Sequence, residues 1–140
     1  MADLIFNSYK TDILAGNIDH DADTIKVALV TSTYVPDQDA HDFFNDVTNE
    51  VTGTGYTAGG ATLASKTVTQ DDTDNEGVFD AADVTWSTST ITARGAVMYK
   101  STGTATTSNL MVYFDFGSDQ SSTAGNFTLQ WGSEGIVNLT

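Results

Sequence analysis

The clearest periodic segment of this chain is Leu110-Met111-Val112-Tyr113-Phe114-Asp115-Phe116. Its side chains alternate, so that Leu110, Val112, Phe114 and Phe116 share one face while Asp115 lies on the other. A hydrophobic period of two residues is typical of a β-strand that buries one face against a core. This segment is therefore predicted to form a strand.

Similar β-branched or alternating segments occur along most of the chain. They predict strands over residues 24–31, 61–70, 78–80, 84–87, 91–100, 127–131 and 136–139. Turn-forming residues separate them, among them a hairpin turn over 71–77 and a polar loop over 117–125. About seven to nine short strands with regular turns favour an antiparallel β-sandwich, or a jelly-roll-like barrel. We expect one all-β domain over residues 1–140, because no linker or internal repeat divides it.

The N-terminal segment has a different period. Phe6, Tyr9, Ile13 and Leu14 form a stripe at helical spacing, which predicts a short helix within residues 1–17. Asp3 is the expected N-cap, and Gly16 is the expected end of the helix. We expect the stripe to pack this helix across a sheet.

The composition excludes several classes of function. The 140 residues include 19 acidic and 5 basic side chains, giving a formal charge of -14. Such a surface repels nucleic acids and anionic membranes, so neither is an expected partner. No apolar run approaches the roughly 20 residues of a spanning helix, and the start lacks a basic signal region, so we expect a soluble, unprocessed chain. The lack of cysteine rules out disulfides, thiolate zinc sites and cysteine nucleophiles.

One acidic segment has the spacing of a calcium loop. Asp72, Asp74, Glu76, Asp80 and Asp83 occupy positions 1, 3, 5, 9 and 12, and Gly77 occupies position 6. The last ligand is Asp where Glu is usual, and both flanks are predicted strands where a calcium loop has helices. A solvated hairpin turn is the favoured interpretation, with structural calcium as the alternative. We expect no other cofactor.

The residues that catalysis requires form no recognisable motif. His20 and His41 lie in acidic loops without a neighbouring nucleophile, and no Gly-x-Ser-x-Gly elbow occurs. We therefore expect no enzyme activity. Tyr34, Tyr56 and Tyr99 are candidates for stacking on sugars, although tyrosines of a sandwich more often bridge core and water.

Four segments carry a resemblance to a known group of proteins. They are Asp23–Ser32 (DTIKVALVTS), Gly53–Leu63 (GTGYTAGGATL), Phe79–Trp86 (FDAADVTW) and Ile91–Lys100 (ITARGAVMYK). Together they resemble small virion structural proteins of tailed bacteriophages. None of the four segments has a chemical rationale, so the resemblance implies a context and no active site. Within that context, a small, β-rich, acidic chain resembles the capsid decoration, or cement, proteins that bind the outside of the shell.

This resemblance implies partners and a location. We expect the protein in the virion, after synthesis in the host cytoplasm, bound between capsomers to the major capsid protein or to other virion proteins. A homo-oligomer is expected, because such proteins commonly lie on symmetry axes. The candidate contact residues are Leu4, Phe6, Tyr9, Tyr56 and Arg94. Arg94 is also expected to pair with an Asp, either within the chain or across an interface.

Three other functions stay open from the sequence. A tail or fibre module could bind host glycans through Tyr34, Tyr56 or Tyr99. A head–tail connector or tail-tube subunit would also use a β-sandwich without chemistry. A glycan hydrolase would need two carboxylates at a set separation, which sequence spacing does not give.

Overall fold

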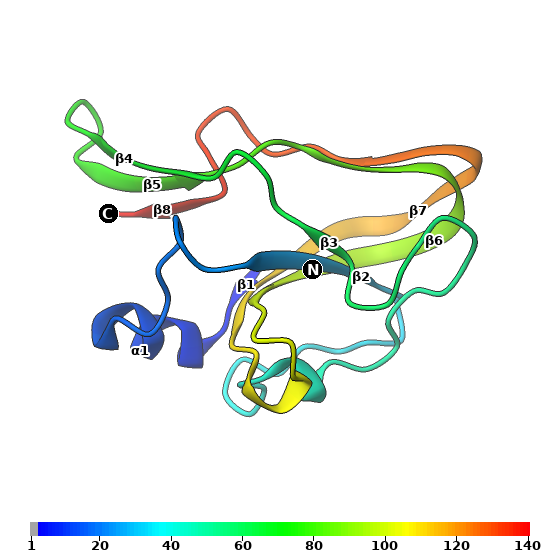
Figure 1. The fold of residues 1–140 in the computed structure, drawn as a ribbon, viewed down its shortest axis with the longest axis horizontal. Helices are drawn as coiled ribbons and strands as arrows, with labels where there is room; N and C mark the ends of the chain where they lie inside the picture. Colours follow the sequence, from blue (N-terminus) through cyan, green and yellow to red (C-terminus); the bar gives the residue numbers. More distant parts are fainter. Residues whose placement is uncertain (1–2) are drawn as a thin grey trace.

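A computed structural model describes residues 3–140 and confirms the all-β class with one N-terminal helix (Figure 1). In chain order the elements are β1 (Leu4–Ile5), α1 (Asn7–Ala15), β2 (Ile25–Val30), β3 (Ala61–Thr62), β4 (Thr67–Asp71), β5 (Glu76–Asp80), β6 (Val84–Lys100), β7 (Leu110–Leu129) and β8 (Val137–Leu139). Two 3₁₀ turns, η1 (Phe44–Asp46) and η2 (Ala105–Thr107), lie in the connections. The strands form a five-stranded antiparallel sheet, β1-β7-β6-β2-β3, and a three-stranded antiparallel sheet, β4-β5-β8.

Two long strands dominate the larger sheet. β6 and β7 pair from Val84 opposite Leu129 to Tyr99 opposite Leu110, and the register shifts at several points between them. Thr88 and Ala124 have positive φ angles of 49° and 45° at the shifts near the middle of the ribbon. Because β-bulges bend the strand that carries them, the paired ribbon turns back over itself at the right of Figure 1. Both strands of this bent hairpin belong to the five-stranded sheet.

The expected loop over residues 117–125 is wrong. These residues belong to β7, and the separate strands expected over 84–87 and 91–100 belong to β6. Gly, Ser and Asp are poor strand formers on their own. Here they are held by the ladder to β6 and by hydroxyl pairs across it, such as the 2.8 Å bond between Thr92 and Ser121.

The N-terminal helix is shorter than expected. Leu4 and Ile5 pair with Tyr113 and Val112 of β7, so α1 begins at Asn7. Its N-cap is Phe6, which makes no side-chain cap bond, so the expected cap by Asp3 is wrong. Residues 1–2 of the expected helix lie outside the described residues.

The end and the buried face of the helix are partly as expected. Gly16 closes α1 in the left-handed conformation, with a φ of 72° and a hydrogen bond from its N–H to the carbonyl of Ile13. Tyr9 is buried, but Leu14 is 90% exposed, so the packed stripe does not include it.

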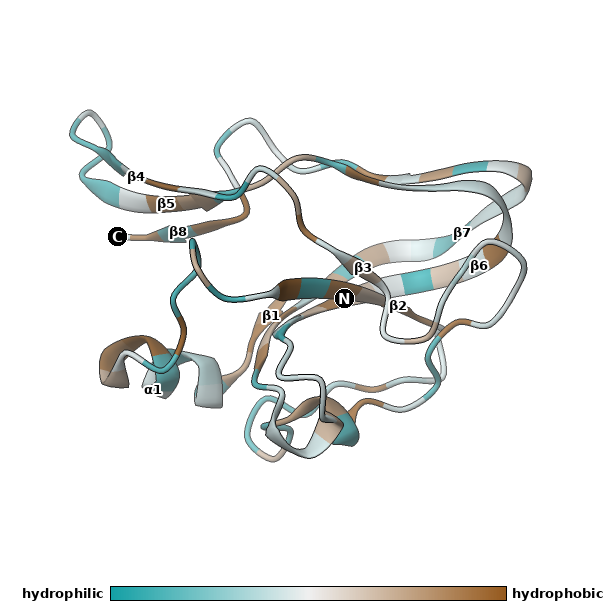
Figure 2. Cartoon of the chain, viewed as in Figure 1, coloured by the Kyte–Doolittle hydropathy of each residue, from teal (hydrophilic) through white to brown (hydrophobic). Residues whose placement is uncertain are grey.

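The core of the protein is built around β2. Every residue of β2 except Lys26 is buried, which explains its run of apolar residues without alternation. Figure 2 shows this apolar strand in the centre of the molecule and the hydrophilic turn between β4 and β5 at one end. Phe44, Val47, Phe114 and Trp131 pack against the core but are only partly buried.

The small sheet extends from the core at the end of the molecule where α1 lies (Figure 1). We call this sheet, residues 67–80 and 137–139, the arm. Phe79 of β5 is buried and anchors it, whereas Thr67 to Gln70 of β4 are all exposed, on both faces of the strand. Among the described strands, β4 pairs only with β5, so its outer edge is uncovered.

Candidate functional site

The hairpin turn at the tip of the arm gathers three carboxylates. Asp71, Asp74 and Glu76 each place one oxygen within 4.8 Å of the others. The Asp71 carboxylate accepts hydrogen bonds from the N–H groups of Thr73, at 2.8 Å, and Asp74, at 3.2 Å. A turn that an Asp side chain closes in this way is the expected turn over residues 71–77.

The five residues with calcium-loop spacing do not come together. Only Asp74 and Glu76 are in the cluster, because β5 is extended from Glu76 to Asp80 and carries the later carboxylates away from the turn. Asp80 accepts a bond from the N–H of Ala81 at 2.8 Å, and Asp83 accepts one from the N–H of Trp131 at 2.9 Å. Asp72 accepts a bond from the Gln70 amide.

Strand geometry therefore overrides the loop spacing. Asp71, which the spacing omitted, could have been found from the pairing of an Asp at the start of a hairpin turn with two following N–H groups. Clusters of exposed acidic side chains are common in such turns, so this cluster by itself is not evidence of a metal site.

His20 lies between the helix and the arm. Its Nε2 is 2.6 Å from the Tyr9 hydroxyl, and its ring packs on Phe79 with 4.9 Å between centroids. Burial lowers the pKa of His20, although the nearby carboxylates of Asp19 and Asp23 raise it. The imidazole thus joins two elements of the fold.

His41 also contacts a core tyrosine. Its Nδ1 lies 2.9 Å from the Tyr34 hydroxyl and accepts the N–H of Asp37 at 3.2 Å. Burial raises the pKa of Tyr34 above its ordinary value, so this hydroxyl stays protonated near neutral pH. The contacts of both histidines are those of structural residues.

The three candidate sugar-stacking tyrosines lie inside the fold. Tyr34 and Tyr99 are buried and Tyr56 is half-buried. The Tyr56 hydroxyl donates to Glu50 Oε2 at 2.6 Å and accepts the N–H of Leu29 at 2.9 Å. The Tyr99 hydroxyl donates to the Gly59 carbonyl at 2.6 Å. The bonds of Tyr56 and Tyr99 hold the glycine-rich loop to the central strands, and Tyr34 and Tyr99 are too buried to stack on a sugar.

The expected partner contacts need correction. Phe6 and Tyr9 are 0% and 1% exposed, so they belong to the core and are not open to a partner. Sequence periodicity marks a face that is buried, but it does not say whether the chain itself covers that face. Leu4 is half-buried in β1. Arg94 lies 3.2 Å from the carboxylate of Asp115 within the same chain, which decides between the two ion pairs expected for it.

Two exposed apolar side chains lie on the arm. Val68 is 52% exposed and Leu139 is 62% exposed, and both border a groove of about 200 Å³ between the arm and α1. The groove is lined by Tyr9, Ile13, His20, Val68, Gly77, Val78, Phe79, Val137 and Leu139. Sequence reasoning missed this surface, because local sequence does not show that the second half of the strand expected over residues 61–70 lies outside the core.

Comparisons with protein-family models, with curated proteins and with solved structures found no match to this chain. Within residues 3–140, α1 is too short to cross a bilayer, and no other stretch forms an apolar helix of spanning length.

Proposed function

We propose that this chain is a non-enzymatic structural component of a tailed-bacteriophage virion. More specifically, we propose a capsid decoration protein that binds the outer shell between capsomers. The four resembling segments supply the context, and three of them include the buried strand β2, the glycine-rich loop and much of β6.

The arm is the observation that carries this proposal. The strand β4 is exposed on both faces and has an uncovered edge, and exposed apolar side chains lie at Val68 of β4 and Leu139 of β8, so this part of the arm contributes little to the core. Such strands are templates for association with another chain. An arm that lies between neighbouring shell subunits gives each copy several modest contacts, and multivalent attachment turns these into stable binding.

The charge of the chain supports the same function. A net charge of -14 keeps many copies apart before assembly. It also steers each copy toward basic patches on a shell and raises the rate of encounter. The acidic tip of the arm, with Asp71, Asp74 and Glu76, places part of this charge at the proposed contact.

Binding to shells that lack the protein tests the proposal. Purified protein should bind to them in saturable fashion, and Val68→Asp should weaken that binding about tenfold or more. Leu14→Asp is the matched control, because Leu14 is an apolar residue 90% exposed on α1 and outside the arm. Equal binding by both variants, or no binding of the wild type, would refute the proposal.

The number of copies per virion separates the structural alternatives. A decoration protein should be present on the order of hundreds of copies, as expected for a shell covered at repeated positions. Quantitative electrophoresis of purified virions measures this number. A few dozen copies or fewer would indicate a connector, tail or fibre subunit.

A further inference from the structure

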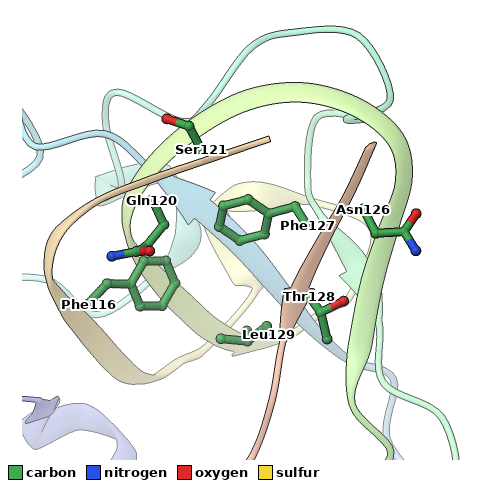
Figure 3. Close-up of a pocket in the computed structure, with 7 residues that line it drawn as sticks. All are labelled: Phe116, Gln120, Ser121, Asn126, Phe127, Thr128 and Leu129. Carbon is green, nitrogen blue, oxygen red and sulfur yellow. The ribbon is translucent and has the colours of Figure 1, made fainter. Parts of the chain in front are cut away.

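A concavity opens where β7 bends back on itself, away from the arm (Figure 3). Its volume is about 420 Å³, within the range of roughly 300–1,000 Å³ that is usual for small-molecule sites. All of its lining residues belong to β7, on either side of the bend: Phe116, Gln120, Ser121, Asn126, Phe127, Thr128 and Leu129. The sequence did not predict this site, because the pattern of residues 117–125 indicates a loop and not part of a strand.

Two phenylalanine rings give the concavity its apolar surface. Figure 3 shows Phe127 between the two stretches of β7 and Phe116 beside Gln120. The ring centroids of Phe116 and Phe127 lie 6.3 Å apart, and Trp86 packs edge-on against Phe127 at 6.1 Å. Phe127 is only 6% exposed, so core packing holds its ring in place. The apolar surface is thus formed before any ligand arrives.

Polar groups surround these rings. The Gln120 amide donates to Ser118 Oγ at 3.0 Å, and Figure 3 shows its oxygen on the side of Phe127. Beyond Tyr113, β7 pairs only with β6 among the described strands. The outer edge of this stretch therefore has no strand partner, so a ligand beside it can bond those backbone N–H and C=O groups that side chains leave open.

The chemistry of the lining selects the class of ligand. None of the lining residues is charged, although 24 of the 140 side chains of the protein are acidic or basic, counted as 19 plus 5. An anionic ligand would have no cationic side chain to pair with in the lining, and the net negative charge of the protein would repel it. A cationic ligand would have no carboxylate to pair with in the lining. A wholly apolar ligand would cover the amide of Gln120 without bonding it. A neutral ligand with one apolar face and several hydroxyls satisfies both kinds of surface.

We propose that this concavity binds a neutral carbohydrate. The C–H face of one sugar ring lies on Phe116, which is the less buried of the two rings, beside the small exposed part of Phe127. Gln120 and the free edge of β7 bond its hydroxyls. This role is separate from shell attachment, because the concavity and the arm share no residue.

Binding of purified full-length protein to neutral oligosaccharides of glucose, galactose, mannose and N-acetylglucosamine tests the proposal. Sialylated and sulfated oligosaccharides serve as the anionic set. NMR titration should show binding to at least one neutral oligosaccharide, none to the anionic set, and shifts centred on residues 116–121 and 127–129. Phe116→Leu, which keeps an apolar side chain but removes the flat ring, should weaken binding about tenfold, and so should Gln120→Ala.

Gln130→Ala is the matched control, because Gln130 is exposed next to β7 but does not line the concavity. It should bind as the wild type does, and all three variants should keep the wild-type thermal midpoint within a few degrees. No binding at millimolar oligosaccharide, or binding that both Phe116→Leu and Gln120→Ala leave intact, would overturn the proposal. So would β7 amide shifts with extended peptides but not with sugars, because strand addition would then be the role of this edge. Shell binding by Phe116→Leu is expected to be normal, which keeps this result independent of the proposed function.

Discussion

Tyr56 shows how one hydroxyl joins a loop to the core. Beyond the short pairing with β3, the N–H of Leu29 has no strand partner on that side, and Tyr56 supplies the acceptor. The same hydroxyl donates to Glu50, whose Oε2 also accepts the N–H of Gly59 at 2.7 Å. Burial and the neighbouring Glu50 carboxylate raise the pKa of Tyr56, so the donor remains protonated over the physiological range.

Removal of this hydroxyl should destabilise the fold. Tyr56→Phe leaves the Leu29 N–H and the Glu50 carboxylate without that partner, at a cost of about 1–3 kcal/mol for buried groups. Tyr99→Phe is the comparison, since it removes one bond to the Gly59 carbonyl and should cost only about 1 kcal/mol. Urea denaturation measures both free energies of unfolding. A larger loss for Tyr99→Phe than for Tyr56→Phe would contradict the role given to Tyr56.

His20 should make stability depend on pH. Burial lowers its pKa below the ordinary value of 6.5, so the unfolded chain binds the proton more readily than the folded chain. Its contribution to stability is therefore complete above about pH 6.5 and is lost as the pH falls toward the folded-state pKa.

The measurement compares wild type with His20→Gln at pH 7 and at pH 5. Most carboxylates stay ionised over this range, because their ordinary pKa values lie near 4. The wild type should lose more stability than the variant over this interval. Equal losses would show that His20 has the same pKa in both states.

At the scale of elements, the glycine-rich loop lies so close to β2 that position 60 has no room for a side chain. A Cβ on Gly60 would lie 1.9 Å from the carbonyl oxygen of Val27, and Gly60 has a φ of 79°. Contact of this kind places the Tyr56 loop against the central strands. The bends of β6 and β7 also depend on particular positions, because β-bulges at the register shifts set where the paired strands turn.

Gly60→Ala should therefore be far more harmful than an alanine at a glycine with free space. Gly103 is the matched control, with a φ of 86° and no atom within 4 Å of an added Cβ. Gly103→Ala bears only the cost of the left-handed conformation, about 1–2 kcal/mol. Gly60→Ala bears that cost and the displacement of β2, and should lose several kcal/mol or fail to fold. Thermal midpoints and circular dichroism compare the two, and similar values would refute the close approach.

At the scale of the whole molecule, like charge opposes the compact state. The excess of 19 acidic over 5 basic side chains produces repulsion that salt screens, with a Debye length of about 30 Å at 0.01 M and 10 Å at 0.1 M. The thermal midpoint should rise by a few degrees between 10 and 150 mM sodium chloride, equivalent to about 1 kcal/mol.

Calcium chloride at the same ionic strength distinguishes screening from a specific site. If the cluster of Asp71, Asp74 and Glu76 is an ordinary acidic turn, calcium and magnesium should raise the midpoint equally, and EDTA should leave it unchanged. A rise of many degrees with calcium alone would show specific binding.

The sequence predicted those features that depend on neighbours along the chain. The alternation at 110–116, the β-branched run of β2, the hairpin turn over 71–77 and the end of α1 at Gly16 all follow from local conformational preference. The all-β class follows from the number of such strand-like segments and turns, and the acidic charge follows from composition. Each of these local features could be predicted because the residues that determine it are close in sequence.

Other features depend on residues that are distant in the sequence and meet only in the folded chain. Leu4 and Ile5 form a strand because β7 offers an edge, and residues 117–125 continue β7 because β6 runs beside them. Phe6 and Tyr9 are covered by the chain's own strands, Arg94 meets Asp115, and Phe116 meets Phe127 across a bend. Local sequence carries the propensity for a strand or a turn, whereas burial and pairing depend on which surfaces the folded chain brings together.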